Sequence, residues 1–295
     1  MLDPRRLITF REVAGRRSFS RAAEALALTQ PAVSQQVGAL ERQLGAELLV
    51  RRPGGLALTE AGELLLEHAN ALSDRLRLAD AQLTELVAGA GARLRVGAFP
   101  SALASVVPDA IGALRASDPE LVVEAREGSQ ADLAAGVLAG DLHVAVCFED
   151  AGAEPREHLG LQRQELGREP MDAAVGADHR LARRRSTRLD ALAEDTWTAP
   201  SRDGLVYRAC VTAGFEPRIG YMTRDPLAIR GLIAAGLAVT LVPRLLAGQL
   251  TGIRTLRLSG EVPHRRLYAL APESGARPAA LAFVEAVAKA VASRV

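Results

Sequence analysis

The sequence predicts an α/β protein with an all-α N-terminal part: a winged helix-turn-helix, a long linker helix and a two-lobed α/β domain. Three observations predict this class. Residues 18–41 read as two short helices separated by a tight turn. Apolar side chains then recur at spacings of four and three over roughly 30 residues, which is typical of a helix with a packing seam. From residue 91 onward, short apolar runs alternate with helical patterns, as in βαβ units.

These patterns place the expected domain boundaries. The winged helix-turn-helix should occupy residues 1–58, the linker helix 59–90 and the α/β domain 91–295. Within the α/β domain, the first lobe should combine about 91–165 with 268–295, and the second should occupy about 166–267. A chain of 295 residues that is 48% hydrophobic is long enough for more than one core.

The first helices carry clear start signals. Asp3 and Pro4 should open the first helix, with Leu7 and Phe10 packing inward, and Ser18 should cap the second. A third helix is expected from Pro31, where a first turn tolerates a missing N–H. Its expected buried stripe is Val33, Val37, Leu40 and Leu44.

The opposite face of that third helix carries short polar side chains, Gln30, Ser34 and Gln35. Such groups can hydrogen-bond base edges or phosphates when a helix lies in a major groove. By spacing alone, DNA binding and a plain amphipathic helix pair explain the pattern about equally well. The candidate DNA-binding residues are Gln30, Pro31, Ser34, Gln35, Arg51 and Arg52.

Arg51 and Arg52 belong to a segment, residues 47–58, that reads as a two-stranded wing with a glycine-rich tip. Arginines at such a tip can contact phosphates or the minor groove. The alternative is that they are two solvated loop side chains. The formal net charge is only +1, so any DNA affinity must come from local contacts of this kind.

The linker helix should begin at Thr59, as its cap, and end at a hinge formed by Gly89-Ala90-Gly91. A helix of this length, about 45 Å at 1.5 Å per residue, needs a partner helix along its seam. A second copy of the chain is the simplest partner, and packing against the following domain is the alternative. The candidate dimerisation residues are Leu65, Leu72, Leu76 and Leu83.

The C-terminal pattern predicts a parallel sheet in each lobe. Strands are expected at 94–98, 121–124, 144–148, 171–175, 196–199, 237–242 and 267–270. Helices are expected at 103–115, 131–139, 189–192, 205–212, 226–235 and 281–291.

Motifs for enzymatic or cofactor chemistry are missing from the sequence. The five histidines are scattered, the two cysteines are far apart, and the Walker, Gly-x-Ser-x-Gly and His-Glu-x-x-His patterns do not occur. We therefore expect no enzyme activity, no metal and no cofactor. The N-terminus does not read as a signal peptide and the longest apolar run is too short to span a bilayer, so a cytoplasmic protein without a membrane partner is expected.

Particular residues make the chain resemble the LysR-type transcriptional regulators. In the N-terminal part they are Thr29-Gln30-Pro31-Ala32-Val33-Ser34, Leu40-Glu41, Leu44-Gly45, Arg51 and Leu58-Thr59-Glu60-Ala61-Gly62. Further on they are Leu94-Arg95-Val96-Gly97-Ala98, Leu138-Ala139-Gly140-Asp141-Leu142, His179-Arg180-Leu181-Ala182 and Ala234-Ala235-Gly236-Leu237. The chain departs from the family pattern at Arg17, Leu49, His143 and Arg180.

The resemblance implies a C-terminal effector-binding domain with the fold of periplasmic binding proteins and an inducer between its lobes. Ligands of such folds meet strand ends and helix N-termini, which favours a small carboxylate or another polar anion. The candidate effector-binding residues are Ser101, Ser129, Cys147, Phe148, Ser201 and Thr223. Plain helix capping explains each serine alone equally well.

The resulting hypothesis is a regulator that binds an inverted-repeat operator in double-stranded DNA as a homodimer. The resemblance further implies a homotetramer and RNA polymerase as a partner. One alternative is a ligand-independent architectural DNA-binding protein, and a weaker one is a solute-binding module or enzyme with an accessory helical domain. A redox role for Cys147 and Cys210 is a competing hypothesis, but buried inert thiols are the better interpretation.

Overall fold

The computed structural model describes residues 2–53, 55–87, 93–153 and 158–295. The chain forms two compact units, an N-terminal one that contains residues 1–90 and a C-terminal one that contains most of the remainder. The expected hinge, Gly89-Ala90-Gly91, lies outside the described residues. Among the helices described, none combines the length and apolar character of a membrane span.

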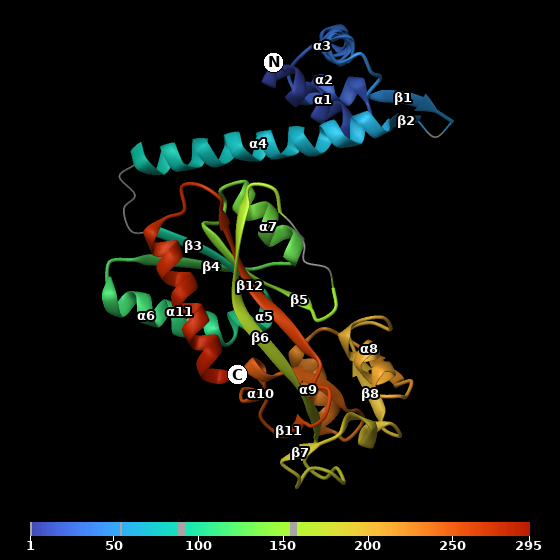
Figure 1. Cartoon of the computed structure of the whole chain (residues 1–295), viewed down its shortest axis with the longest axis vertical. Helices are drawn as coiled ribbons and strands as arrows, with labels where there is room; N and C mark the ends of the chain where they lie inside the picture. The colour runs from blue at the N-terminus through green and yellow to red at the C-terminus, as the bar shows by residue number, and fades with distance from the viewer. Residues whose placement is uncertain (1, 54, 88–92, 154–157) are drawn as a thin grey trace. The chain divides into compact units, whose positions relative to one another are not determined.

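Three helices form the base of the N-terminal unit: α1 (Pro4–Arg16), α2 (Phe19–Ala25) and α3 (Gln30–Leu44) (Figure 1). Asp3, Ser18 and Thr29 cap them, each accepting a backbone N–H with its side-chain oxygen. Their shared core contains the fully buried side chains Phe10, Val13, Ala22, Val33 and Leu40.

The expectation that Leu44 is buried is wrong. It is 42% exposed because α3 ends there, and Leu48, 1% exposed, enters the core instead.

The wing consists of β1 (Leu49–Arg52) and β2 (Gly55–Leu58), paired antiparallel. Glu41 of α3 fixes the residue before β1, since its Oε1 accepts the backbone N–H of Leu48 at 2.9 Å.

Thr59 caps the long helix α4 (Glu60–Val87), accepting the N–H of Gly62 at 3.0 Å. A Cβ at Gly62 would lie 2.1 Å from the Leu48 carbonyl oxygen, so this close approach of helix and wing requires glycine.

The seam of α4 divides into two parts. Leu65 is buried and Leu72 partly buried in the core of their own unit, where α4 packs on α1. Leu76 and Leu83 are 49% and 61% exposed. Leu65 therefore belongs to the core of its own unit, because the first turns of α4 complete the helix-turn-helix core, and the assignment of the four leucines to dimerisation stays a prediction.

The C-terminal unit contains a curled mixed sheet with the strand order β4-β3-β5-β12-β6-β11-β7, and β10 pairs with β6. A separate parallel pair is formed by β8 and β9. The strands are β3 (Arg93–Ala98), β4 (Val122–Glu127), β5 (Val144–Asp150), β6 (Leu161–Gly176), β7 (Ser186–Thr187), β8 (Thr196–Ala199), β9 (Arg218–Met222), β10 (Thr240–Pro243), β11 (Ile253–Leu258) and β12 (His264–Pro272).

The helices of this unit are α5 (Pro100–Leu103), α6 (Val106–Ser117), α7 (Gln130–Leu138), η1 (Leu189–Leu192), α8 (Leu205–Thr212), α9 (Pro226–Ala234), α10 (Arg244–Ala247) and α11 (Pro278–Arg294). In the first lobe, α6 and α11 pack together over a core that includes Phe99 and Phe283. The second lobe has its own core around Trp197, whose Nε1 donates to the Leu192 carbonyl at 3.2 Å.

Among the described strands, parallel pairing joins β3 to β4 and β5, β8 to β9, and β7 to β11. The long strands β6 and β12 are antiparallel to each other, and β10 and β11 are antiparallel to β6. Residues 161–170 of β6 pair with β12, whereas residues 171–176 pair with β10 and β11, so β6 runs from one lobe into the other (Figure 1). The expected lobe boundaries at 165/166 and 267/268 consequently fall inside these two strands.

Candidate functional site

Helix α3 separates its polar and apolar faces cleanly. Gln30, Pro31, Ser34 and Gln35 are exposed, while Val33, Val37 and Leu40 on the other face are buried. The intervening Gln36 turns inward, and its Oε1 accepts the Thr9 hydroxyl at 2.6 Å. The structure thus brings the four predicted groove-facing residues of α3 together on one solvent-facing surface, as base or phosphate contact requires.

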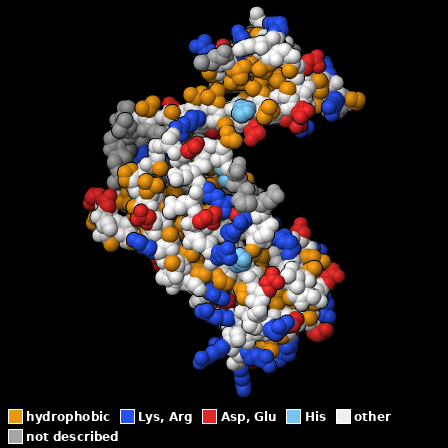
Figure 2. Space-filling model, viewed as in Figure 1, with side chains coloured by type: hydrophobic (Ala, Val, Ile, Leu, Met, Phe, Trp, Pro, Cys, Tyr) orange, Lys and Arg blue, Asp and Glu red, His pale blue; other side chains and the backbone are white. Residues whose placement is uncertain are grey.

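Arg51 and Arg52 lie at the end of β1, next to the turn of the wing, and both are exposed. Arg51 stands opposite Leu56 and Arg52 opposite Gly55 in the strand pairing. Neither arginine forms an ion pair within the described part of the chain. Both guanidinium groups are therefore available to phosphates. Figure 2 shows basic and acidic side chains interspersed on the N-terminal unit, in keeping with the low net charge.

In the C-terminal unit, Ser101 is buried at the start of α5. Its Oγ accepts a hydrogen bond from Nη2 of Arg265 at 2.9 Å, and its carbonyl oxygen accepts the Ser105 hydroxyl at 2.5 Å. The N-cap of α5 is Phe99 and makes no side-chain capping bond. Helix capping, the simpler interpretation of Ser101, is therefore not its role.

Arg265 organises the surroundings of Ser101. Its Nε donates to Glu169 Oε2 at 3.0 Å, and its Nη2 donates to the same oxygen. Its guanidinium carbon lies 4.3 Å from the ring centre of Phe148 and 5.0 Å from that of Phe99, and the two rings meet edge to face at 4.8 Å. The arrangement gives Ser101 and Phe148 a common, rigid neighbour.

Sequence reasoning missed Arg265, Glu169 and Phe99. Arg265 and Glu169 lie in polar stretches of β12 and β6, where no apolar alternation marks a strand. A charged residue in such a stretch gives no local sign that it is buried. Only the pairing of β6 with β12 places Arg265 directly opposite Glu169.

Ser129 and Phe148 are linked through the first turn of α7. Ser129 Oγ accepts the Asp132 N–H at 3.2 Å, so the capping interpretation applies to it. The next residue, Gln130, accepts the Phe148 N–H with Oε1 at 3.0 Å. The carboxyl ends of β3, β4 and β5 thereby carry Ser101, Ser129 and Phe148 at one edge of the first lobe.

Cys147 does not belong to this group. It is fully buried beside Leu133 and Tyr268, in a core cluster different from the one that Phe148 packs against. Successive strand residues point to opposite faces, which explains the separation. Burial raises the pKa of its thiol to about 12, although nearby Arg163 lowers it.

In the second lobe, Ser201 and Thr223 follow the parallel strands β8 and β9 and are both half-buried. The Thr223 N–H donates to the Ala199 carbonyl at 3.3 Å, and the Thr223 Oγ1 accepts the Asp225 N–H at 3.1 Å. The two predicted residues therefore share the carboxyl edge of that strand pair.

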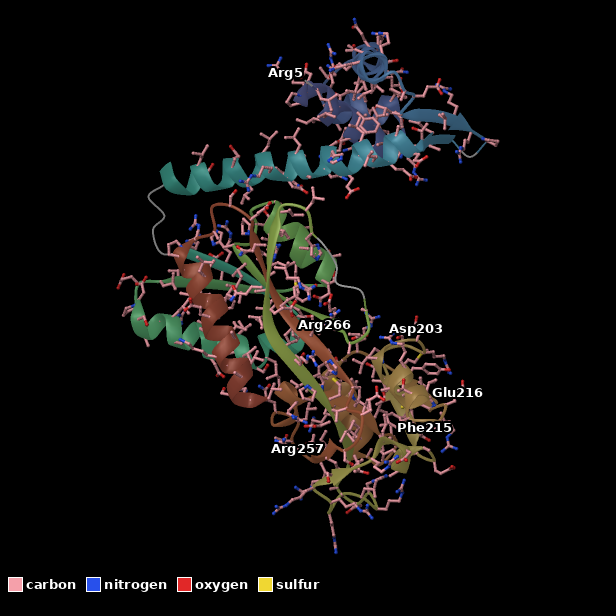
Figure 3. All side chains as sticks on the ribbon, in the orientation of Figure 1. Arg5, Asp203, Phe215, Glu216, Arg257 and Arg266 are labelled. Atoms are coloured by element: carbon pink, nitrogen blue, oxygen red, sulfur yellow. The ribbon has the colours of Figure 1, made fainter. Side chains whose placement is uncertain are left out.

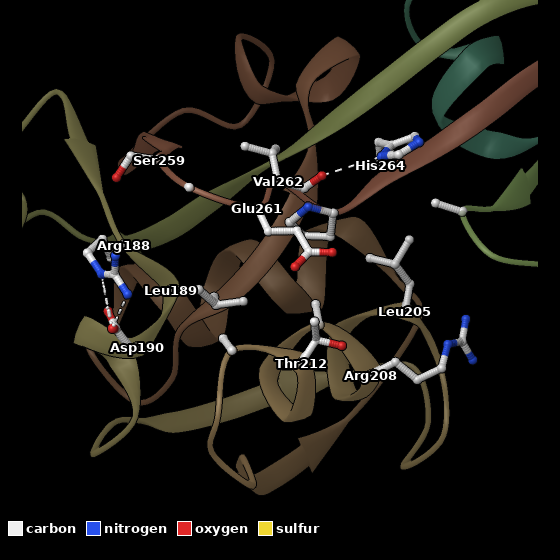
Figure 4. Close-up of a pocket in the computed structure, with 15 residues that line it drawn as sticks. Arg188, Leu189, Asp190, Leu205, Arg208, Thr212, Ser259, Glu261, Val262 and His264 are labelled. Carbon is white, nitrogen blue, oxygen red and sulfur yellow. Dashed lines mark hydrogen bonds and ion pairs between the residues drawn. The ribbon is translucent and has the colours of Figure 1, made fainter.

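An ion pair joins the two lobes: Nη2 of Arg208 in α8 donates to Asp150 Oδ2, at the end of β5, at 2.5 Å. Nη1 of Arg208 also donates to the carbonyl oxygen of Asp203, which Figure 3 labels, at 2.5 Å. Beside this ion pair lies a pocket of about 420 Å³ with Arg208, Glu261 and His264 in its lining (Figure 4). None of the six predicted effector residues lines it.

Comparisons with known proteins match both units. Residues 4–63 match the family described as bacterial regulatory helix-turn-helix protein, lysR family, and residues 88–292 match the LysR substrate binding domain. The uncharacterized HTH-type transcriptional regulator YnfL of Escherichia coli (strain K12) is 30% identical over 253 residues, 82% of each chain. The transcriptional dual regulator GltC of Bacillus subtilis (strain 168) is 30% identical over 268 residues, 89% of this chain and 87% of GltC.

Solved structures match the chain over nearly its whole length. The crystal structure of full-length CbnR complexed with its target DNA has a TM-score of 0.58 at 28% identity and covers 98% of this chain and 99% of CbnR. ArgP from Mycobacterium tuberculosis has a TM-score of 0.63 at 22% identity and covers 98% of this chain and 97% of ArgP, a likeness of fold.

Proposed function

Because the chain belongs to the LysR family of DNA-binding transcriptional regulators with an effector-binding domain, we propose how its own residues perform that function. Gln30, Pro31, Ser34 and Gln35 of α3 contact base edges and nearby phosphates in the major groove, and Arg51 and Arg52 of the wing contact phosphates. The observation that carries this assignment is the sorting of α3 into a buried apolar face and an exposed face that carries Gln30, Ser34 and Gln35.

The operator is an inverted repeat in double-stranded DNA, read by a homodimer. The exposed Leu76 and Leu83 of α4 favour pairing with a second copy, since exposed leucines at heptad spacing otherwise contact water. A twofold arrangement would place two α3 helices in successive major grooves. We further propose that two dimers form a tetramer, that RNA polymerase is its partner at the promoter, and that it acts in the cytoplasm, where its DNA is.

The effector is a small carboxylate or a similar polar anion held between the lobes. Ser101 and Ser129, with the first turn of α7, would supply donors from one lobe, and Ser201 and Thr223 from the other. Phe148 would form an apolar wall, and Arg265 would hold Ser101 and Phe148 in place. We infer that transcriptional regulation is the whole activity of the chain and that it catalyses no reaction of its own.

The first experiment measures binding of the full-length protein to the DNA upstream of its own gene and to random DNA across a salt series. A preference of several hundred-fold that survives moderate salt is the expected result. Equal, salt-sensitive binding to both DNAs would instead indicate an architectural protein or a different operator.

A second experiment tests the effector site with a panel of small carboxylates, read by thermal shift and by change in the DNA footprint. A carboxylate that stabilises the wild type should stabilise Ser101→Ala much less. Ser117→Ala is the control, because Ser117 is an exposed residue at the end of α6. A footprint that no carboxylate alters would favour the ligand-independent alternative.

A further inference from the structure

A recess of about 940 Å³ in the second lobe has a strongly basic lining, away from every residue assigned above. Six arginines contribute to it, together with a single acidic residue, Asp172: Arg183, Arg184, Arg185, Arg244, Arg254 and Arg257. Figure 2 shows basic side chains gathered at this end of the unit, around β7 and β11, and Figure 3 labels Arg257 there. From this recess we infer a second ligand site, for a compact oligophosphate such as a linear triphosphate.

The only carboxylate of the lining is already neutralised. Arg244 and Asp172 form a forked pair, with Nη2 to Oδ1 at 2.8 Å and Nε to Oδ2 at 3.2 Å. Their side chains are 14% and 7% exposed, so this pair forms a rigid part of the wall. The charge of the other arginines is thus left uncompensated within the recess.

Those five remaining arginines are all exposed. Within the described residues, none of their side chains forms an ion pair or a hydrogen bond. Five exposed arginines that line one recess attract an anion, and an anion with several charges gains more from them than a single charge does. Guanidinium also matches phosphate oxygens in a forked geometry, which makes phosphate the favoured anion.

The backbone holds these arginines in two fixed groups. Arg254 and Arg257 lie on β11, which pairs with β6, and the Arg257 N–H donates to the Arg185 carbonyl at 3.1 Å. The segment that carries Arg183 to Arg185 is anchored upstream, where Arg180 donates to Asp195 at 2.9 Å. Residues of this strand and of this loop therefore line the same recess.

The dimensions favour a compact ligand over a nucleic acid. Arg254 and Arg257 are three residues apart on β11, so their Cα atoms are about 10 Å apart at roughly 3.3 Å per residue. The recess volume lies within the range of small-molecule sites. A duplex would need a longer path of basic side chains along its phosphates.

The test is calorimetric titration of the full-length protein with inorganic triphosphate, and separately with ATP, at about 0.15 M salt. Half-saturation below about 1 mM is expected with at least one of them, and orthophosphate at matched ionic strength should bind at least tenfold more weakly. Equal affinities for triphosphate and ATP would show that the site recognises the phosphate chain. Tighter binding of ATP would show that the site recognises a nucleotide. No binding of either would overturn the proposal.

The variants test the location. Arg254→Ala/Arg257→Ala should weaken triphosphate binding at least tenfold, and Arg254→Lys/Arg257→Lys at least threefold, since lysine keeps the charge but loses the fork. The matched control is Arg115→Ala/Arg224→Ala, which removes two exposed arginines of the same unit outside the recess. It should stay within twofold of the wild type.

If Arg254→Ala/Arg257→Ala and the control lose triphosphate affinity equally, the loss is a general charge effect, and the proposed site is contradicted. Lost affinity for random duplex DNA with unchanged triphosphate binding would show a nucleic-acid surface instead. If the β11 variant unfolds, judged by circular dichroism, Arg183→Ala/Arg184→Ala tests the same recess from its loop side. Operator preference, which we assign to α3, should be unchanged in every variant, so this proposal and the proposed function can fail separately.

Discussion

Arg265 and Glu169 form an ion pair in which the side chains are only 10% and 0% exposed, between the neighbouring strands β12 and β6 of the C-terminal unit. The Glu169 carboxylate also accepts the Leu245 N–H at 3.1 Å with Oε1, and Arg265 donates to Ser101. One buried carboxylate thus holds β6, β12 and α10 together and positions a predicted effector residue.

Glu169→Gln should destabilise the C-terminal unit by about 3–5 kcal/mol, because it leaves the buried Arg265 charge without its counter-ion. Urea unfolding followed by circular dichroism measures the loss. Glu165→Gln is the control: Glu165 is an exposed partner of Arg163 on the same strand, and its removal should cost about 1 kcal/mol or less. Similar midpoints for the two variants would refute the assigned role of Glu169.

His143 should make stability depend on pH. Its Nδ1 accepts the Arg95 N–H at 3.0 Å, and burial, with a smaller effect of the Arg95 charge, lowers its pKa to about 4. The unfolded chain therefore binds the proton more tightly than the folded one. Neutral His143 therefore stabilises the folded chain fully above pH 6.5. As the pH falls toward 4, this contribution to the free energy of unfolding, on the order of 3 kcal/mol, is lost.

Chemical denaturation of wild type and His143→Asn between pH 7 and 4 checks this expectation. Asparagine can still accept the Arg95 N–H but does not titrate, so its stability should fall less over that interval. Parallel pH profiles for the two proteins would show that His143 does not contribute.

Both cysteines should be unreactive in the folded protein. Burial raises the pKa of Cys147 and of Cys210 to about 12, so at pH 8 only about one thiol in ten thousand is ionised. They also lie in different core clusters. A thiol reagent at pH 8 should label neither before denaturation and both afterwards, and rapid labelling of native protein would revive the redox hypothesis.

Substitutions in α3 and in the wing should change DNA binding in different ways. Gln35→Ala should relax sequence preference, because that side chain faces the groove. Arg51→Ala should weaken specific and random binding alike and lower the slope of affinity against salt by about one. Titrations of operator and random DNA over a salt series measure both effects, and equal behaviour of the two variants would argue against this division.

Much of the N-terminal unit could be predicted because its signals are local. Asp3 and Ser18 cap helices within three residues of themselves, and the faces of α2 and α3 follow the helical period. In the second lobe, β8 and α8 occupy their expected ranges for the same reason. The strands β9 and β11 and the first ten residues of β6 gave no such signal, since polar residues interrupt their apolar pattern.

The sequence by itself determined the helix-turn-helix, the long helix, the α/β character of the C-terminal unit and the resemblance to a regulator family. Those features depend on hydrogen bonds and periodicities within a few residues. Tertiary structure alone decided that Leu65 is a core residue, that β6 serves both lobes, that Arg265 reaches Ser101 across 164 positions of the chain, and that separated arginines share one recess. These relationships depend on long-range strand pairing, and burial and charge clustering follow only once the strands have paired.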